Sequence, residues 1–199
     1  TLKSTSWGLE PDLYTTTGSK VSDHSATNDI RDIAVNGVSV YLVGENGSVY
    51  YTPNIVTDFF TPGVSITNKT LQGVDFVVGF TNKATAVGTG SEVIRLNTTF
   101  GTKINRVFSA KMNDVHFGNG LFGTVIGDYY FVRSTTDGGM SWKINVPSTV
   151  VGTAGLTKVW TKSNPNGTHF AVIGGVNYFL KADNGVVTHT ALSGTVNDI

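Results

Sequence analysis

The side chains that could perform acid–base, metal or nucleophilic chemistry are few and scattered. The chain has 14 Asp plus Glu, four His and no Cys. Its histidines (His24, His116, His169 and His189) show no metal-ligand spacing such as H-x-x-x-H, and without cysteine neither thiol chemistry nor a Cys-ligated zinc is available. Nucleophile-elbow, phosphate-loop and dinucleotide motifs are absent. We therefore predict no metal, no cofactor and no enzymatic activity, with glycoside hydrolysis by carboxylates in a central funnel as an alternative.

Polar side chains in predicted turns are better suited to binding. Short Asp, Asn and Glu side chains can bond sugar hydroxyls, and nearby aromatic rings can stack on a pyranose. The same Asp and Asn types also form Asx turns that cap backbone N–H groups, so both interpretations stay open. The candidate ligand-binding residues are Trp7, Asp12, Asp29, Glu45, Asn46, Asp114, Asp128, Tyr129, Trp160 and Asn177.

Composition restricts the partners and the fold class. Lys plus Arg equals Asp plus Glu at 14 each, so no long-range field would attract nucleic acid or an anionic membrane. Charged residues make up 14% of the chain and there are 24 Gly, a balance that favours short strands and turns. No apolar run is long enough to span a bilayer. We predict one all-β domain over residues 1–199 that neither binds nucleic acid nor inserts into a membrane, with an extracellular or cell-surface location favoured over a cytoplasmic one.

A repeat is the main evidence for architecture. A strand that ends in an apolar residue and Gly, a short turn and a second strand recur around Gly8, Gly44, Gly88, Gly127 and Gly174, at steps of 36, 44, 39 and 47 residues. A second mark, Asn-Asp-Ile or Asn-Asp-Val, occurs at 28–30, 113–115 and 197–199. This spacing is typical of four-stranded propeller blades.

The repeat predicts a five-bladed β-propeller with antiparallel blades of ~40 residues. Its approximate units are 1–27 plus 196–199, 28–70, 71–111, 112–154 and 155–195, and the N- and C-terminal strands would share one blade to close the ring. Accidental similarity within a β-sandwich, and a fragment of a longer propeller, remain alternatives.

One segment fits the Asp-box pattern [ST]-x-D-x-G-x-[ST]-W at every defined position. The matching residues are Thr135, Asp137, Gly139, Ser141 and Trp142. In such a turn the Asp bonds its own backbone, Gly supplies a positive φ, and Trp packs beneath. Together with the repeat, this segment resembles the Asp-box (BNR-repeat) β-propeller superfamily. By size and five-fold repetition the chain is also similar to small tachylectin-type propeller lectins.

The resemblance implies a binding protein more readily than a sialidase, because the chain has four arginines (Arg31, Arg95, Arg106 and Arg133) and no Arg-Ile-Pro motif. We expect a non-enzymatic, multivalent lectin that binds glycans or glycoproteins at repeated sites between blades on one face. A structural or adhesion module that docks a protein within a larger surface or viral assembly is the second hypothesis.

Overall fold

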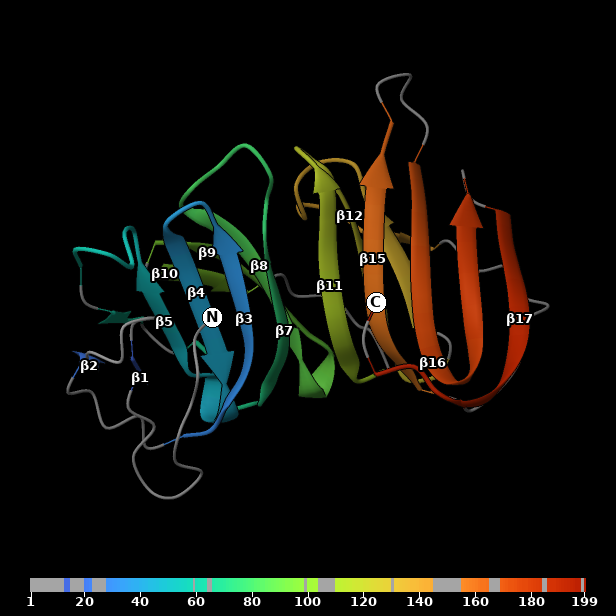
Figure 1. The fold of residues 1–199 in the computed structure, drawn as a ribbon, viewed down its shortest axis with the longest axis horizontal. Coiled ribbons are helices and arrows are strands. Elements are labelled where there is room, and N and C mark those ends of the chain that lie inside the picture. The colour runs from blue at the N-terminus through green and yellow to red at the C-terminus, as the bar shows by residue number, and fades with distance from the viewer. Residues whose placement is uncertain are drawn as a thin grey trace.

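The computed structural model describes residues 13–14, 20–22, 28–58, 60–63, 66–98, 100–103, 110–129, 131–144, 155–164, 169–183, 186–197 and 199. These residues form antiparallel β-sheets and two short 3-10 turns, η1 (Glu45–Gly47) and η2 (Thr89–Ser91). Within the described ranges there is no helix long and apolar enough to cross a membrane. The all-β prediction is therefore confirmed (Figure 1).

Four sheets succeed one another along the chain from β3 onward, and we number them as blades one to four. Blade one contains β3 (Ile30–Asn36), β4 (Ser39–Gly44), β5 (Val49–Thr52) and β6 (Thr61–Pro62). Blade two contains β7 (Leu71–Phe76), β8 (Lys83–Gly88), β9 (Glu92–Asn97) and β10 (Phe100–Lys103). Blade three contains β11 (Met112–Asn119), β12 (Phe122–Gly127), β13 (Phe131–Thr135) and β14 (Lys143–Ile144). Blade four contains β15 (Leu156–Ser163), β16 (His169–Asp183) and β17 (Val186–Thr195). A separate pair joins β1 (Leu13–Tyr14) to β2 (Lys20–Ser22).

The same register recurs in the first two strands of each blade. Ile30 pairs with Gly44, Leu71 with Gly88 and Met112 with Gly127, and a bulge follows each pair. A Cβ atom on Gly44, Gly88 or Gly127 would lie 2.0, 2.2 and 2.1 Å from the carbonyl oxygen of the residue that precedes β3, β7 and β11. Glycine recurs at this position because no side chain fits between the two strands.

Blade four departs from the predicted pattern in two ways. Leu156 pairs with Gly175, so Gly175, and not Gly174, is the equivalent of Gly127. The turn expected after this glycine is also absent, because β16 continues without a break from pairing with β15 to pairing with β17. The prediction of four strands is therefore wrong for the described part of blade four, which forms a three-stranded sheet.

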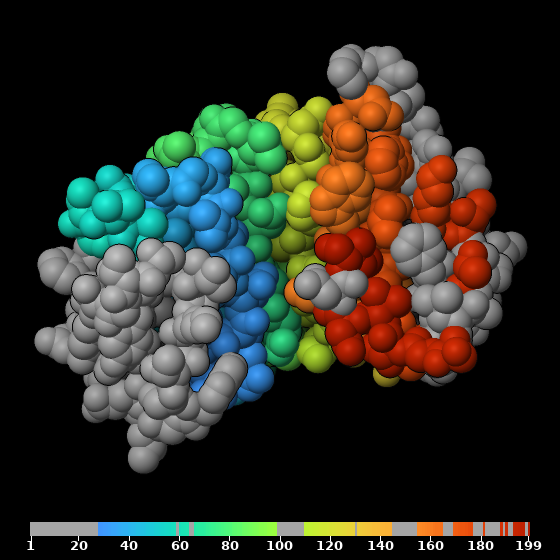
Figure 2. Space-filling view, in the orientation of Figure 1, coloured from blue at the N-terminus to red at the C-terminus, as the bar shows by residue number. Residues whose placement is uncertain are grey.

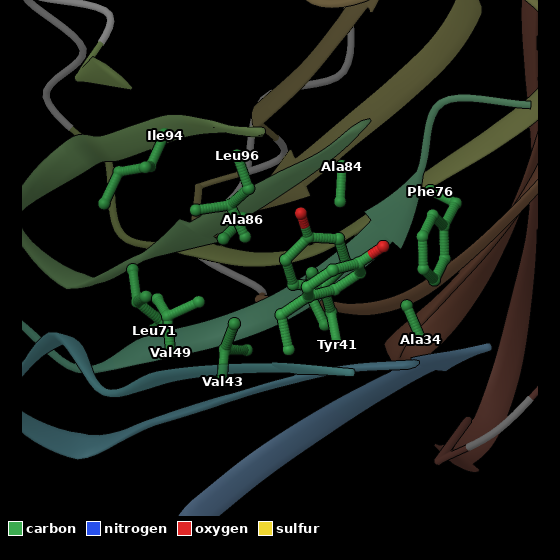
Figure 3. Close-up of a cluster of buried hydrophobic side chains, with 12 residues drawn as sticks. Ala34, Tyr41, Val43, Val49, Leu71, Phe76, Ala84, Ala86, Ile94 and Leu96 are labelled. Atoms are coloured by element: carbon green, nitrogen blue, oxygen red, sulfur yellow. The ribbon is translucent and has the colours of Figure 1, made fainter. Parts of the chain in front are cut away.

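The core consists of layers between neighbouring blades. One layer joins Tyr41, Val43 and Tyr51 of blade one to Val74 and Phe76 of blade two (Figure 3). The Tyr41 ring lies 4.6 Å from Tyr51 and 5.2 Å from Phe76, measured between centroids. A second layer packs blade two on blade three. Face-to-face burial of this kind holds sheets together as wedges rather than as one continuous sheet.

The first strands of the blades, β3, β7, β11 and β15, lie side by side in sequence order, and β7 and β11 each contact both neighbouring first strands. The coloured segments cross the molecule in the same order (Figure 2). Most of the predicted fifth unit lies outside the described residues. At the C-terminus, Val196 N–H donates to Gly175 O at 3.2 Å, which places this segment against blade four.

Candidate functional site

The turns between strands divide between two ends of the blades. The loop end holds the segments that precede each first strand and those that join the second strand to the third. Backbone bonds tie these segments together: Glu45 N–H donates to Asp29 O at 3.0 Å, and Asp128 N–H donates to Lys111 O at 2.9 Å. These two kinds of segment therefore lie together at one end of the blades. The opposite end, the tip end, holds the hairpin turns β3–β4, β7–β8 and β11–β12, along the upper edge of Figure 1.

In blade one, the polar side chains of the loop end bond to one another. Asn28 Nδ2 donates to Ser48 Oγ at 2.9 Å, and Asn46 Nδ2 donates to Asn28 Oδ1 at 2.7 Å. Arg31 pairs with Glu45 and lies 3.8 Å from an Asp29 oxygen. Asn46 adopts a φ of 52°, which an Asn side chain tolerates better than most.

In blade three, the loop end combines an amide, a carboxylate and an exposed ring. Asn113 Nδ2 donates at 2.8 Å both to Asp128 Oδ1 and to Leu156 O of blade four. The second oxygen of Asp128 makes no hydrogen bond to another described residue. Tyr129 follows with a φ of 58° and a side chain 66% exposed. A carboxylate and an aromatic ring thus lie at two consecutive positions of one turn, and the amide lies on the neighbouring strand β11.

Blade two carries a different set at the loop end. Glu92 is buried and its Oε1 accepts a hydrogen bond from Thr67 Oγ1 at 3.2 Å. Lys69 packs beside Gly90 in the neighbouring turn. Because blades one, two and three present different groups at equivalent turns, the described loop end is not a ring of identical sites.

A second group of polar residues lies on the first strands and joins one blade to the next. Asp32 Oδ2 accepts the N–H of Val74 at 2.8 Å, and Asp114 Oδ2 accepts the N–H of Val159 at 3.0 Å. Asp32 and Asp114 occupy the same register position, because each is the third residue of the first strand of its blade and follows the bulge. Their carboxylates therefore replace a missing backbone ladder between first strands.

Blade two makes the same connection two residues later. Its residue at the position of Asp32 is Gly73, where a Cβ atom would lie 2.9 Å from Asp114 Cα. The carboxylate instead comes from Asp75, whose Oδ2 accepts the N–H of Phe117 at 2.6 Å. His116 occupies the position of Asp75 in blade three and accepts the N–H of Thr161 at Nδ1, at 3.0 Å.

The burial of these groups changes their ionisation. Burial raises the pKa of Asp75 to about 7 and that of Asp114 to about 6, although backbone hydrogen bonds and, for Asp114, Lys158 oppose the shift. Burial also raises the pKa of Asp32. Burial lowers the pKa of His116, consistent with a neutral ring that accepts a hydrogen bond at Nδ1. These groups hold the first strands of neighbouring blades together.

The remaining predicted ligand residues are dispersed. Trp7 and Asp12 lie outside the described residues, and Asn177 lies within β16. Trp160 lies in the middle of β15, partly exposed, with its ring 6.2 Å from His116 and 5.7 Å from Phe170. The structure therefore brings Asp29, Glu45 and Asn46 together in blade one, and Asp128 and Tyr129 together in blade three.

Two placements from the sequence need correction. Asp114 was expected in a loop, but it lies inside β11, is buried, and accepts backbone N–H groups with both oxygens. The mark at Asn28-Asp29-Ile30 is also out of register with Asn113-Asp114-Val115. Ile30, and not Asp29, begins the strand, so the equivalent segment is Arg31-Asp32-Ile33. Sequence reasoning missed Asp32 and Asp75, and alternate acidic positions in predicted first strands were the available signal.

The turn over residues 135–142 has the hydrogen bonds expected of its sequence pattern. Asp137 Oδ1 accepts from Thr135 Oγ1 at 2.7 Å and from Ser141 N–H at 2.8 Å, and Oδ2 accepts from Ser141 Oγ. Gly139 has a φ of 83°, and Trp142 is buried against Phe117. This turn lies at the tip end, since Gly138 N–H donates to Leu121 O at 2.9 Å. Its polar atoms are used within the turn, away from the loop end.

The described residues contain no group of three or more His, Asp or Glu side chains arranged to hold a metal ion. Asp32, Asp75 and Asp114 interact electrostatically, but each carboxylate is directed to the backbone of the next blade.

Comparison with known proteins identifies the fold. No protein-family model and none of the curated proteins matches the chain. Among solved structures, YCF48 from Cyanidioschyzon merolae aligns with a TM-score of 0.59 and 17% identity, over 86% of this chain and 59% of that protein. A structure of YCF48 bound to a D1 peptide aligns with a TM-score of 0.59 and 14% identity, over 87% of this chain and 57% of that one.

An ancestral GH74 enzyme aligns with a TM-score of 0.60 and 14% identity, over 92% of this chain and 27% of the enzyme. The chain thus spans less than two thirds of each of these structures. YCF48 and the GH74 enzyme are both β-propellers. With its successive antiparallel blades, this chain has a β-propeller fold.

Proposed function

We propose that this chain is a non-enzymatic binding propeller that recognises a glycan at the loop end of blade three. The observation that carries the proposal is the group formed by Asn113, Asp128 and Tyr129. Asp128 offers an oxygen that is not bonded to the described protein, Asn113 fixes the other oxygen, and Tyr129 offers an exposed ring. A carboxylate and an aromatic face are the usual components of a sugar site.

The proposal differs from the sequence-based hypothesis in the number of sites. A multivalent lectin with repeated sites needs similar groups in successive blades. In blade one, Asn28 and Asn46 are hydrogen-bonded to each other, and in blade two Glu92 is buried. Avidity through several identical sites is therefore not required. One principal site in blade three is the simpler arrangement.

A glycan array probed with the full chain, followed by titration of the best-bound sugar, tests the proposal. Asp128→Asn and Tyr129→Asn should each weaken binding at least tenfold, which corresponds to ~1.4 kcal/mol. Asn at position 129 removes the ring while tolerating the positive φ. Asp58→Asn, an exposed acid in the β5–β6 loop, is the matched control and should bind as the parent does. Absence of binding across the array, or unchanged affinity in both loop variants, would contradict the proposal.

A second candidate function is docking of a protein partner within a larger assembly. The supporting observations are that one structural neighbour is YCF48 bound to a D1 peptide, and that unlike sets of side chains on successive blades suit one asymmetric partner better than a repeated small ligand. A chain that binds no glycan, and whose native mass in its source includes a second protein, would favour this function.

We also propose that the fold is a five-bladed ring of the Asp-box superfamily. Thr157 Oγ1 donates to Val196 O, as Asn113 Nδ2 donates to Leu156 O one blade earlier, which supports Val196 as the start of a fifth first strand. In β3, Ile33 and Val35 are exposed, although the equivalent Val74 and Phe76 of β7 are buried against the preceding blade. A further blade before β3 would cover them.

A further inference from the structure

The residue after the repeated glycine holds an equivalent position in blades one, two and three. Its backbone N–H donates to the carbonyl of the residue that precedes the first strand. These bonds run from Glu45 to Asp29 O at 3.0 Å, from Thr89 to Thr70 O at 2.9 Å and from Asp128 to Lys111 O at 2.9 Å. The turn therefore begins in the same way in the three blades, and two of them place an acid there, Glu45 and Asp128.

The side chain that meets this acid differs between blade one and blade three. The second residue of the first strand is Arg31 in blade one and Asn113 in blade three. Arg31 forms an ion pair with Glu45, so blade one neutralises its own carboxylate. Asn113 instead donates a hydrogen bond from an uncharged amide to Asp128 at 2.8 Å. Blade three thus keeps a negative charge at the position where blade one has an ion pair.

No other cation of the protein takes the place of that arginine. Among the residues that the structure describes, none forms an ion pair with Asp128 in the way that Arg31 does in blade one. Lys111 bonds Asp128 through its backbone carbonyl. Lys158, near the start of β15, is directed to Asp114, with its Nζ 3.9 Å from Oδ2. The Asp128 carboxylate is therefore open to a cation from outside the chain.

The hydrogen-bonding capacity that remains around Asp128 is that of an acceptor. An Asn amide has two N–H donors, and Asn113 uses them on Asp128 Oδ1 and on Leu156 O, each at 2.8 Å. A Cβ atom on Gly155 would lie 3.1 Å from Asp128 Oδ1, so the glycine keeps space beside the carboxylate. Tyr129, the next residue of the turn, has an exposed ring, and the face of a Tyr ring attracts cations. A small cation with several N–H donors suits this combination.

We propose that the blade-three site selects a sugar that carries a free, protonated amino group. The inference rests on the glycan binding proposed above and defines the class of sugar. The ammonium group binds Asp128 as Arg31 binds Glu45 in blade one, with the Tyr129 ring beside it. Acetylation of the amine removes this charge, and a hydroxyl in its place keeps only a hydrogen bond without a charged donor, which is weaker.

Matched sugars that differ only at C2 test the proposal on the full chain. NMR titration with glucosamine, N-acetylglucosamine and glucose, and with the three corresponding galactose derivatives, compares an amine, an acetamide and a hydroxyl on one ring. At about pH 6, below the pKa of an amine, the amino sugar of at least one series should bind about tenfold more tightly than both counterparts. This preference should decrease as sodium chloride is raised, because salt screens an exposed ion pair.

Two variants separate the charge of Asp128 from the shape of the site. Asp128→Asn keeps the size of the side chain, so the amino sugar should then bind no more tightly than its hydroxyl counterpart. Asn113→Arg gives blade three the residue that blade one has and should also remove the preference. Asp58→Asn, at an exposed acid of the β5–β6 loop, is the matched control and should retain it. Thermal unfolding of each variant distinguishes a lost preference from a lost fold.

The outcomes distinguish this inference from glycan binding itself. Equal affinity within both series, or binding of a glycan on the array without binding of either amino sugar, would overturn the amine preference alone. Absence of binding to every sugar would remove both proposals. A preference that persists in Asp128→Asn would place the contact elsewhere and overturn the assignment. A lysine side chain also carries an ammonium group, so N-acetyl-lysine amide is titrated in parallel, and tighter binding of it than of both amino sugars would contradict a sugar ligand.

Discussion

Asp75 reaches from β7 to the backbone of the next blade, where its Oδ2 accepts the N–H of Phe117 at 2.6 Å. Its other oxygen accepts the N–H of Phe76 at 2.8 Å. The carboxylate therefore satisfies one backbone donor in its own strand and another in β11. Asp32, Asp114 and His116 act in the same way. Each accepts a backbone N–H of the next blade, so these polar side chains connect the first strands of neighbouring blades.

The first prediction concerns pH. Burial raises the pKa of Asp75 to about 7 in the folded state, whereas an unfolded Asp titrates near its ordinary value of 3.8. Between these values the folded state holds a proton that the unfolded state has lost, so the contribution of Asp75 to stability is greatest below about pH 4 and falls as the pH rises to about 7. Each such proton contributes a slope of ~1.4 kcal/mol per pH unit. Asp114 adds a similar slope over a shorter range.

Urea unfolding of the parent and Asp75→Asn at pH 5, 6, 7 and 8 checks this slope. Asn keeps an acceptor for the Phe117 N–H but does not titrate, so the variant should lose part of the decline in stability between pH 5 and pH 7. Asp75→Ala should cost ~1–3 kcal/mol at pH 5, because it leaves a buried N–H without an acceptor. Equal slopes in the parent and Asp75→Asn would show that Asp75 does not carry the effect.

The second prediction concerns the repeated glycine. A Cβ atom on Gly88 would lie 2.2 Å from Thr70 O and 2.8 Å from Leu71 Cα, so Gly88→Ala must separate β7 from β8. We expect a loss of more than ~3 kcal/mol, or failure to fold. Gly37→Ala is the matched control: its φ is 63° but nothing lies within 4 Å of the added Cβ, so only the backbone cost of ~1 kcal/mol is expected. Denaturant titration of both variants measures the difference, and equal losses would contradict the close-approach explanation.

The repeat was visible in the sequence because this steric constraint leaves one residue type possible. Gly44, Gly88 and Gly127 each face a backbone carbonyl, so the spacing of these glycines follows from the packing of the first two strands in each blade. In blade four the rule was ambiguous, since Gly174 and Gly175 are adjacent and either satisfies the pattern. The pairing of Leu156 with Gly175 determines the register of β15 and β16. This pairing could not be predicted from the residues around either glycine.

The candidate site was harder to predict. Asp128 and Tyr129 are neighbours in the sequence, so their proximity could be predicted. The amide that donates a hydrogen bond to Asp128 belongs to Asn113 in β11, and this contact could not be predicted from the sequence. The burial of Asp114 follows from the packing of β11 against β15, which depends on contacts 45 residues apart. The local sequence pattern therefore predicted the turns and their polar residues. Tertiary contacts determine which of these residues form hydrogen bonds within the protein.

The third prediction concerns the turn at 135–142, where local sequence alone was sufficient. Burial raises the pKa of Asp137, but hydrogen bonds from Ser141 and Thr135 outweigh it and leave the pKa below its ordinary value. Asp137→Ala removes the acceptor of Thr135 Oγ1, Ser141 N–H and Ser141 Oγ and should destabilise the chain by ~1–2 kcal/mol. Asp137→Asn keeps one acceptor oxygen and should lose less.

Thermal unfolding at pH 7 measures the stability of both variants. As a control, Thr136→Ala changes a neighbouring residue of the same turn for which no hydrogen bond to Asp137 is seen. If Asp137→Ala unfolded at the parent's temperature, the hydrogen bonds of this turn would contribute nothing measurable to stability.

The fourth prediction separates the two aspartates at the start of blade one. Asp29 was selected from the sequence, and its side chain is 69% exposed with an ion-pair distance of 3.8 Å to Arg31. Asp32 was not selected, yet it accepts the N–H of Val74 across the boundary between blades. Exposed ion pairs contribute little, so Asp29→Ala should change stability by less than ~0.5 kcal/mol. Asp32→Ala leaves a buried donor without a partner and should cost ~1–3 kcal/mol.

Urea unfolding at pH 7 compares the two variants directly, and Asp32→Asn serves as the control that keeps an acceptor oxygen. From the register of β3 we expect the order Asp32→Ala, then Asp32→Asn, then Asp29→Ala, from most to least destabilised. If Asp29→Ala were the more damaging change, Asp29 rather than Asp32 would be the equivalent of Asp114. The first strand of blade one would then begin earlier than its pairing with Gly44 indicates, because a shift of register along β3 carries every side chain to a new neighbour.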